Sequence, residues 1–255
     1  MSLQIGAALR SGATVLLSRT GAILFALYAV LMAGLISVSN TMVVRLYEQA
    51  GLTEAASAVP LVIDAPLSAA VGGYLLLTLV STYLSIVATR TFVAGARETF
   101  PEGAFTRNVP LALVNVIVGG IVYGLLWLLG TVALVVPGII AYVAFIFMLP
   151  YIAVEDRNFV DALRSSYTLS KGNWLALFVL VVILIAAAAL VGGIGGVILS
   201  LLLPQALGQL LLAFVQAPIS LYLLAVIAAA FNQLRDDSGS LGGSSPSAQT
   251  SSTAI

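Results

Sequence analysis

Long stretches without a charged residue constrain the fold of this chain more than any other feature. Four such runs occur, at residues 20–44, 65–89, 108–154 and 172–234. A charge is costly in hydrocarbon, and a membrane-spanning helix needs about 20 apolar residues. Charged residues make up only 8% of the chain, against about 25% in soluble proteins. The sequence therefore predicts an all-α integral membrane protein.

The two longest runs must each contain a hairpin. As one helix, residues 108–154 would extend roughly 70 Å, against a bilayer core of about 30 Å. Pro137-Gly138 predicts the turn in this run, and Pro204 and Gly208 predict the turn in the last run. The result is six spans, near residues 21–40, 67–88, 111–135, 139–154, 174–200 and 210–231. Four glycines are expected to kink or break the fifth span: Gly192, Gly193, Gly195 and Gly196.

The basic residues predict the orientation of the six spans. With a cytoplasmic N-terminus, nine of the ten basic residues lie inside and only Arg45 lies outside, as the positive-inside rule requires. The inside set is Arg10, Arg19, Arg90, Arg97, Arg107, Arg157, Arg164, Lys171 and Arg235. We therefore expect a multi-pass cell-membrane protein with both termini cytoplasmic. The chain is predicted to have three parts: an N-terminal amphipathic segment (1–19), a membrane domain (20–235) and a disordered polar tail (236–255).

Three polar-apolar segments on the cytoplasmic side are candidates for helices that lie on the membrane. They are residues 5–19, 92–107 and 159–171. In the third, Phe159, Leu163 and Tyr167 share one helical face, which predicts an amphipathic interfacial helix with these side chains buried. The alternative is a helical loop packed on the spans. Ala-Leu-Arg-Ser occurs at 8–11 and again at 162–165, which suggests three repeated hairpin units, although chance similarity explains such short strings equally well.

The composition excludes several classes of chemistry. The chain has neither Cys nor His, so thiol nucleophiles, disulfides and histidine metal ligands are excluded. The formal net charge of zero argues against a nucleic-acid partner. No Walker loop or Gly-x-Ser-x-Gly elbow occurs. We therefore expect a protein that is not an enzyme and that has no cofactor, metal or catalytic residue.

Residues 137–178 carry a resemblance to a known family. Pro137-Gly138, Pro150, Glu155-Asp156, the Ala162–Ser165 string and Lys171-Gly172-Asn173-Trp174 follow one another in this order. This pattern resembles the membrane domain that some bacteria fuse to glycerophosphodiester phosphodiesterase, and its stand-alone bacterial and archaeal relatives. The resemblance covers about residues 90–235 and implies an architecture, because the phosphodiesterase domain itself is missing. The Arg-rich, Cys-free composition suggests an archaeal source.

Two groups of residues are candidates for binding at the membrane face. Arg157, Arg164 and Lys171, with Trp174, are predicted to hold an anionic lipid headgroup, although topology anchoring would place the same residue types here. Glu155, Asp156 and Asp161 are an acidic cluster that could hold a divalent cation. The competing interpretation puts Glu155 and Asp156 in the first turn of the 159–171 helix, with ordinary ion pairs within that helix.

Small and amide side chains inside the spans are predicted to join helices. Gly120–Gly124 and Gly192–Gly196 have the G-x-x-x-G spacing that allows two helices to approach closely. Asn115, Gln209 and Gln216 are expected to form hydrogen bonds between helices. None of these residues is ionisable, which argues against a proton- or sodium-coupled pump.

These observations predict a non-catalytic membrane scaffold or accessory protein. We expect it to engage membrane lipids, or an unidentified membrane or cytoplasmic protein, through its cytoplasmic in-plane helices. The alternative is a small-molecule or lipid transporter or channel. The oligomeric state is not predicted.

Overall fold

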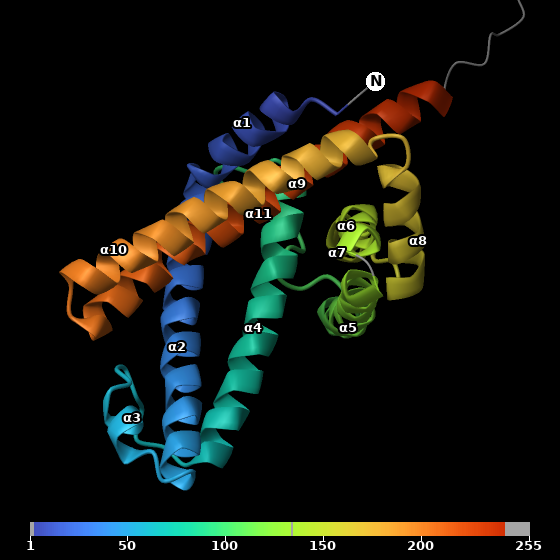
Figure 1. The fold of residues 1–255 in the computed structure, drawn as a ribbon. Helices are drawn as coiled ribbons and strands as arrows, with labels where there is room; N and C mark the ends of the chain where they lie inside the picture. The colour runs from blue at the N-terminus through green and yellow to red at the C-terminus, as the bar shows by residue number, and fades with distance from the viewer. Residues whose placement is uncertain (1–2, 134, 243–255) are drawn as a thin grey trace, which may run out of the picture.

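The computed structural model describes residues 3–133 and 135–242, and this part of the chain is helical without a strand (Figure 1). Six helical segments of it are long and apolar enough to cross a membrane, which confirms the all-α, multi-pass prediction. The elements are α1 (Ile5–Leu16), α2 (Arg19–Gln49), α3 (Thr53–Ser57), α4 (Leu67–Val93), α5 (Val109–Ala133), α6 (Val135–Ala144), α7 (Met148–Glu155), α8 (Phe159–Ser170), α9 (Trp174–Ala189), a π-helical turn (Leu190–Ile194), α10 (Gly195–Leu202) and α11 (Gln205–Gly242).

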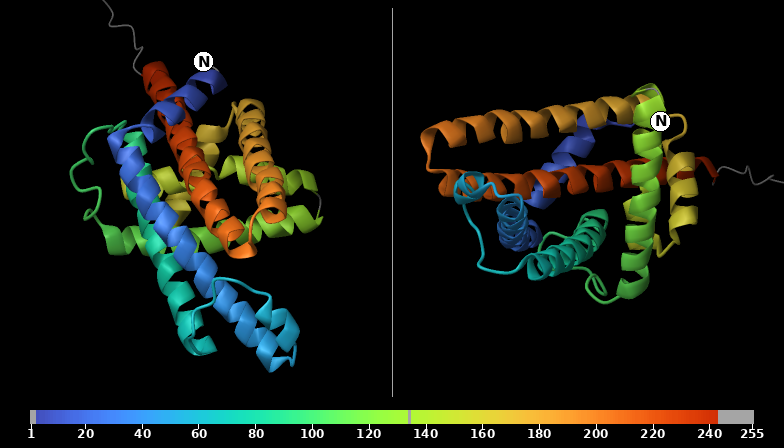
Figure 2. Two further views of the ribbon diagram at one scale, coloured as in Figure 1. Left: turned by 90° about the vertical axis from the view of Figure 1, so that its left-hand side faces the viewer. Right: turned by 60° about the horizontal axis from the view of Figure 1, so that its bottom comes forward.

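The spanning helices form three hairpins that leave a common core in different directions (Figures 1 and 2). The hairpins are α2 with α4, α5 with α6–α7, and α9–α10 with α11. The core lies where α2 and α9 begin and where α4, α7 and α11 end; we call this the basic end. Its largest fully buried side chains include Leu24, Ile86, Phe147, Ile152, Leu177, Leu221 and Phe231.

Hydrogen bonds between distant segments hold the basic end together. Thr20 Oγ1, near the start of α2, donates to the Ala96 carbonyl at 2.7 Å. Asn232 Nδ2 on α11 donates to the carbonyl of Val93, the last residue of α4, at 2.8 Å. The N-terminal segment lies there too, because the Leu3 N–H donates to Asn173 Oδ1 at 3.4 Å. The segments predicted to share the cytoplasmic side thus meet at one end of the molecule.

The far halves of the hairpins expose their apolar side chains. Leu75 of α4, Leu129 of α5 and Leu201 of α10 are 64%, 64% and 79% exposed. These segments keep their backbone hydrogen bonds internal, as helices must in hydrocarbon. Large exposed leucines on such helices are suited to contact with lipid tails rather than with water.

The first hairpin departs from the predicted boundaries. α2 runs to Gln49, well beyond residue 40. The loop expected between the first two spans, residues 41–66, is therefore shorter, because its first part, 41–49, belongs to this helix. The chain folds back along it because Thr41 Oγ1 accepts from the Ile63 N–H at 2.9 Å and Arg45 Nε donates to the Ala65 carbonyl at 2.8 Å. Arg45 also pairs with Asp64 at 2.9 Å.

The fourth span is two helices rather than one. Pro137-Gly138 lies in the first turn of α6, not between helices as predicted, and Gly138 faces Thr131 of α5. The span then breaks at Phe145–Phe147, between α6 and α7. Ser166 of α8 satisfies this break: its Oγ accepts from the Phe147 N–H at 3.0 Å and donates to the Ala144 carbonyl at 2.9 Å.

The fifth span changes its helical form where glycines were expected to disturb it. A π-helical turn at Leu190–Ile194 joins α9 to α10 and contains Gly192 and Gly193. Such wide turns are rare in helices and occur mostly as single insertions. The chain therefore stays helical from Trp174 to Leu202, with a local widening where a kink or break was predicted.

Two of the predicted segments have a different structure. Residues 94–108 form turns and bends rather than an amphipathic helix, with Gly95 and Gly103 at φ of +62° and +71°. The predicted disordered tail begins too early, because α11 continues through Asp236 and Asp237 to Gly242. The remaining tail, 243–255, lies outside the described residues.

Candidate lipid-headgroup groove

A groove of about 490 Å³ at the basic end gathers three of the four predicted headgroup residues. Its lining includes Arg157, Arg164 and Lys171, together with one acidic residue, Asp237 of α11. The remaining lining residues are Tyr151, Ser165, Thr168, Leu169, Asn173 and Leu234. The groove therefore combines an excess of positive charge with hydroxyl and amide groups, which is the chemistry that holds a phosphate.

A left-handed turn between α7 and α8 positions Arg157. Asp156 ends α7 with φ of 52°, and Asn158 then caps α8 by accepting from the Asp161 N–H at 2.9 Å. The Arg157 guanidinium lies 4.9 Å from the Tyr151 ring centre and pairs with Glu155 at 2.7 Å. It also contacts Ser165 Oγ. Arg157 is thus held at the groove wall by three neighbours.

Arg164 and Lys171 lie on the more open side of the groove. The Arg164 side chain is 77% exposed, and its contact with Asp161 is long, at 4.0 Å. Lys171 is the residue at which α8 ends. Charges this exposed contribute little to the fold, because surface ion pairs are worth about 0–1 kcal/mol. Both side chains are therefore available to an anionic ligand.

α8 packs against the protein with a face other than the one predicted to enter the membrane. Its residues buried against the protein are Ala162, Ser166 and Ser170, whereas Tyr167 is 43% exposed, so its burial in the membrane interface stays a prediction. The reason for this packing is the broken fourth span, whose carbonyls need hydrogen-bond donors: Ser170 Oγ lies 3.3 Å from the carbonyls of both Val143 and Ala144. The small serines allow α8 to approach this break closely.

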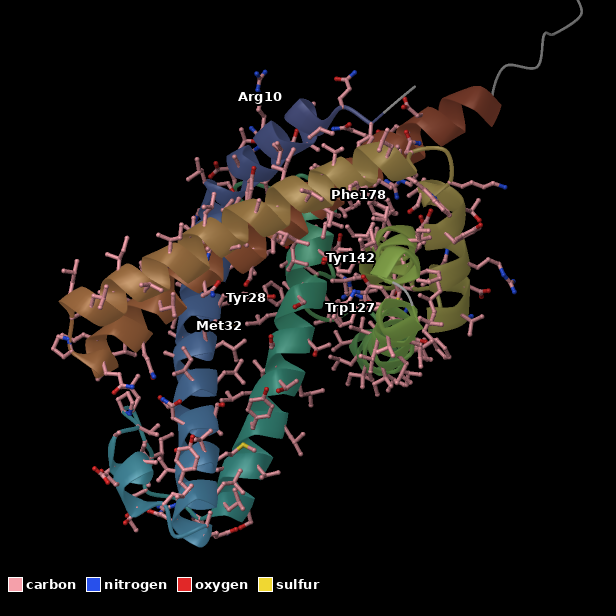
Figure 3. The ribbon with its side chains drawn as sticks, in the orientation of Figure 1. Arg10, Tyr28, Met32, Trp127, Tyr142 and Phe178 are labelled. Carbon is pink, nitrogen blue, oxygen red and sulfur yellow. The ribbon has the colours of Figure 1, made fainter. Side chains whose placement is uncertain are left out.

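Trp174 does not line the headgroup groove. It lines a separate apolar groove of about 350 Å³ between α6 and α9, with Ile139, Ile140, Val143, Leu175 and Phe178. Phe178 lies beside the α6 region in Figure 3. Edge-to-face packing on Tyr167, at 5.9 Å between ring centres, positions the indole. Trp174 Nε1 is buried and has no hydrogen-bond partner among the described residues.

The acidic cluster is not a metal site in the part of the chain that the structure describes. Glu155 and Asp156 lie at the end of α7, so the prediction that they start the next helix is wrong. Each is flanked by two arginines. Glu155 pairs with Arg157 and lies 3.8 Å from Arg235, and Asp156 pairs with Arg107 at 3.1 Å. Their charges are therefore largely compensated.

Arg90 is a central residue that sequence reasoning assigned only to topology. Among the described residues it is the one charged side chain that is buried, at 5% exposure. Its Nε donates to the Ala153 carbonyl at 2.7 Å and its Nη1 to the Ala104 carbonyl at 3.1 Å. Arg107 Nη2 donates to the neighbouring Val154 carbonyl at 2.6 Å. The two arginines thus satisfy carbonyls that the end of α7 leaves without helical partners.

The predicted glycine contacts divide into two kinds. Gly192 faces Gln216 and Gly196 faces Leu212, both on α11. Gly120 and Gly124 have nothing within 4 Å of an added Cβ, so the prediction that they lie at a helix crossing is wrong for this structure. Gly119 of α5, in contrast, does face a neighbour, because an added Cβ would lie 2.9 Å from Met148 Sδ.

Two of the predicted amides join distant segments. Asn115 Oδ1 on α5 accepts from the Phe159 N–H at 3.0 Å, so it helps to cap α8. Gln209 Oε1 on α11 accepts from Asn40 Nδ2 of α2 at 2.8 Å. The bond at Gln209 connects two hairpins and the bond at Asn115 connects α5 to α8, so both amides join helices as predicted.

Most of the chain matches a recognised sequence family. The match covers residues 3–234, and the family is described as a domain of unknown function (DUF7847). The chain belongs to the DUF7847 family. Comparison with curated proteins and with solved structures found no match. The DUF7847 match includes the groove residues from Tyr151 to Leu234 and ends before Asp237, while the resemblance to phosphodiesterase-linked membrane domains stays a prediction.

Proposed function

We propose that this protein is a non-catalytic membrane protein that engages anionic lipid headgroups through the basic groove, as a scaffold or accessory factor. The observation that carries the proposal is the convergence of Arg157, Arg164 and Lys171 in one groove. Basic residues near a membrane surface attract anionic lipid by about 1 kcal/mol each. The hydroxyls of Tyr151 and Ser165 in the lining add donors for phosphate oxygens.

The predicted orientation puts this groove at the cytoplasmic leaflet, where anionic lipids concentrate. The groove lies at the basic end, where the core is, because α7, α8 and α11 all contribute to it. A headgroup bound there would contact parts of two hairpins at once. Lipid binding would therefore stabilise one arrangement of the hairpins, which is how a scaffold or accessory protein can respond to its membrane.

The experiment reverses the two exposed cations of the groove, in the variant Arg164→Glu/Lys171→Glu. Protein purified from an equimolar mixture of phosphatidylglycerol and phosphatidylcholine is analysed by native mass spectrometry. Each cation contributes about 1 kcal/mol to lipid binding, so the loss of both should lower bound phosphatidylglycerol about 30-fold. The two negative charges introduced in their place should lower it further. Thermal stability in detergent should change by less than about 1 kcal/mol.

Arg10→Glu/Arg19→Glu is the matched control, because it makes the same charge change at exposed positions outside the groove lining. It should keep bound phosphatidylglycerol at the wild-type level. If the groove variant retains as much anionic lipid as this control, the headgroup proposal is wrong, and engagement of a protein partner is the remaining form of the scaffold hypothesis.

Transport is the second candidate function, and one observation favours it. A pocket of about 420 Å³ lies between α2, α4 and α11, and its lining includes Ser39, Asn40, Tyr74 and Gln209. Figure 3 shows Met32, which also lines this pocket, on the part of α2 that leaves the core. A proteoliposome assay of lipid or solute movement, compared between wild type and Asn40→Leu, tests this candidate directly.

A further inference from the structure

The headgroup groove and the apolar groove at Trp174 lie next to each other along the chain. Lys171 ends α8 and lines the first groove, and Trp174 begins α9 and lines the second. Three residues of extended chain reach on the order of 10 Å, so the Cα atoms of Lys171 and Trp174, one from each lining, are at most about this far apart. This is the scale of the headgroup and glycerol region of a phospholipid.

The second groove is apolar along its length and runs away from the basic end. The Val143 carbonyl lies 3.3 Å from Ser170 Oγ, so this part of α6 is near the end of α8. Ile139 and Ile140 lie about one turn farther along α6, and Phe178 lies one turn from Trp174 along α9. The groove therefore follows the direction in which a lipid tail would leave a headgroup held at Lys171.

Trp174 lies between the charged residues and the rest of the apolar groove along the chain. It follows Lys171 by three residues and is the first residue of α9. Lys171 lines the charged groove, and Trp174 lines the apolar one. The order of chemistry along the α8–α9 junction is therefore cation and then apolar groove.

We infer that one anionic glycerophospholipid occupies both grooves, with its phosphate at Arg164 and Lys171 and one acyl chain in the α6–α9 groove. The inference rests on the proposed headgroup function and adds the class of lipid and the path of its chain. The phosphate matches the positive groove in charge, and the chain matches Ile140 and Phe178 in polarity. The glycerol region then lies near Trp174, the lining residue of the apolar groove that is nearest to Lys171 in the chain.

The first test fills the apolar groove and leaves the charges unchanged. Ile140→Trp places a large side chain in it, and Ile183→Trp is the matched control because Ile183 is as exposed, at 39% against 40%, and does not line the groove. Native mass spectrometry should show that Ile140→Trp retains less phosphatidylglycerol than the wild type, by about fivefold or more. A fivefold loss corresponds to about 1 kcal/mol, the lower end of the cost of overpacking. Ile183→Trp should retain lipid at the wild-type level.

The second test uses the fluorescence of Trp174. The chain has two tryptophans, so Trp127→Phe leaves Trp174 as the single emitter. Phosphatidylglycerol brominated near the glycerol end of one chain should quench this emission at a much lower mole fraction than brominated phosphatidylcholine does. Arg164→Glu/Lys171→Glu in the same background should make the two lipids equal.

The outcomes separate this inference from the headgroup proposal. If Arg164→Glu/Lys171→Glu loses lipid while Ile140→Trp retains it, the headgroup function stands and the two-groove inference is overturned. If both variants retain lipid, both proposals fall. Loss of lipid by Ile140→Trp alone also overturns the inference, since it requires the cations and the apolar groove to hold the same molecule.

Discussion

Arg90 Nε donates a hydrogen bond to the main-chain carbonyl of Ala153 at 2.7 Å, joining the end of α4 to the end of α7. The same guanidinium lies 3.8 Å from Asp156, through Nη2 and Oδ1. The bond connects two hairpins at the residues where both spans end. The packing of the basic end, and with it the wall of the headgroup groove formed by Tyr151 and Arg157, depends on this contact.

Replacement of Arg90 should destabilise the fold strongly. Arg90→Leu removes two hydrogen bonds from a charged donor, to the carbonyls of Ala153 and Ala104, at about 1.5–3 kcal/mol each. The Ala104 carbonyl then has no side-chain donor among the described residues, and the Ala153 carbonyl keeps only the longer bond from Arg107 Nη2, at 3.2 Å. We expect a loss of at least about 3 kcal/mol in the free energy of unfolding in detergent, measured by denaturant titration. Arg97→Leu, on an exposed arginine of the adjacent loop, should change it by less than about 1 kcal/mol. Equal effects of the two variants would contradict the assigned role of Arg90.

The same substitution at two helical glycines should have opposite effects. Gly12 of α1 lies against α11, and an added Cβ would lie 2.6 Å from Val226 Cγ2 and 3.0 Å from the Val226 main-chain nitrogen. Gly12→Ala should therefore cost about 1–3 kcal/mol of stability. Gly120→Ala meets open space and should be neutral or stabilise α5 by up to about 1 kcal/mol, since Ala favours helix. Thermal unfolding of both variants checks the pair, and a destabilised Gly120→Ala would show that this face is covered.

The sidedness of the membrane orientation can be measured by cysteine labelling, because the chain has no cysteine of its own. Ser11 of α1 and Thr168 of α8 are exposed at the basic end, and Ser57 of α3 is exposed beside the far half of α2 (Figure 1). Cysteines at the first two positions should react with an impermeant maleimide only from the cytoplasmic side, and a cysteine at Ser57 only from outside. Labelling of Ser11→Cys and Thr168→Cys from opposite sides would refute the six-span orientation.

The candidate site was partly readable from the sequence. Arg157, Arg164 and Lys171 were grouped because basic residues at a membrane face attract anionic lipid, and the structure places all three in the lining of one groove. Trp174 follows in sequence and was grouped with them, but it packs on Tyr167 and faces α6. Which side of the next helix a residue occupies depends on how that helix enters the bundle, and sequence spacing does not carry across the turn at Gly172.

Charge-free runs and basic residues were enough to predict the fold class, the six spans and the clustering of basic residues, because the cost of burying charge in hydrocarbon acts on each residue separately. Where the spans break, which faces pack and what satisfies the carbonyls at helix ends follow instead from contacts between distant helices. Ser166 and Ser170 form hydrogen bonds with the backbone at the break near Phe147. Arg90 is buried because the carbonyls of Ala153 and Ala104 both accept from it. Such contacts join residues far apart in the chain, so their energy depends on the positions of both partners. A local sequence pattern contains only one of the two partners and therefore cannot predict the contact.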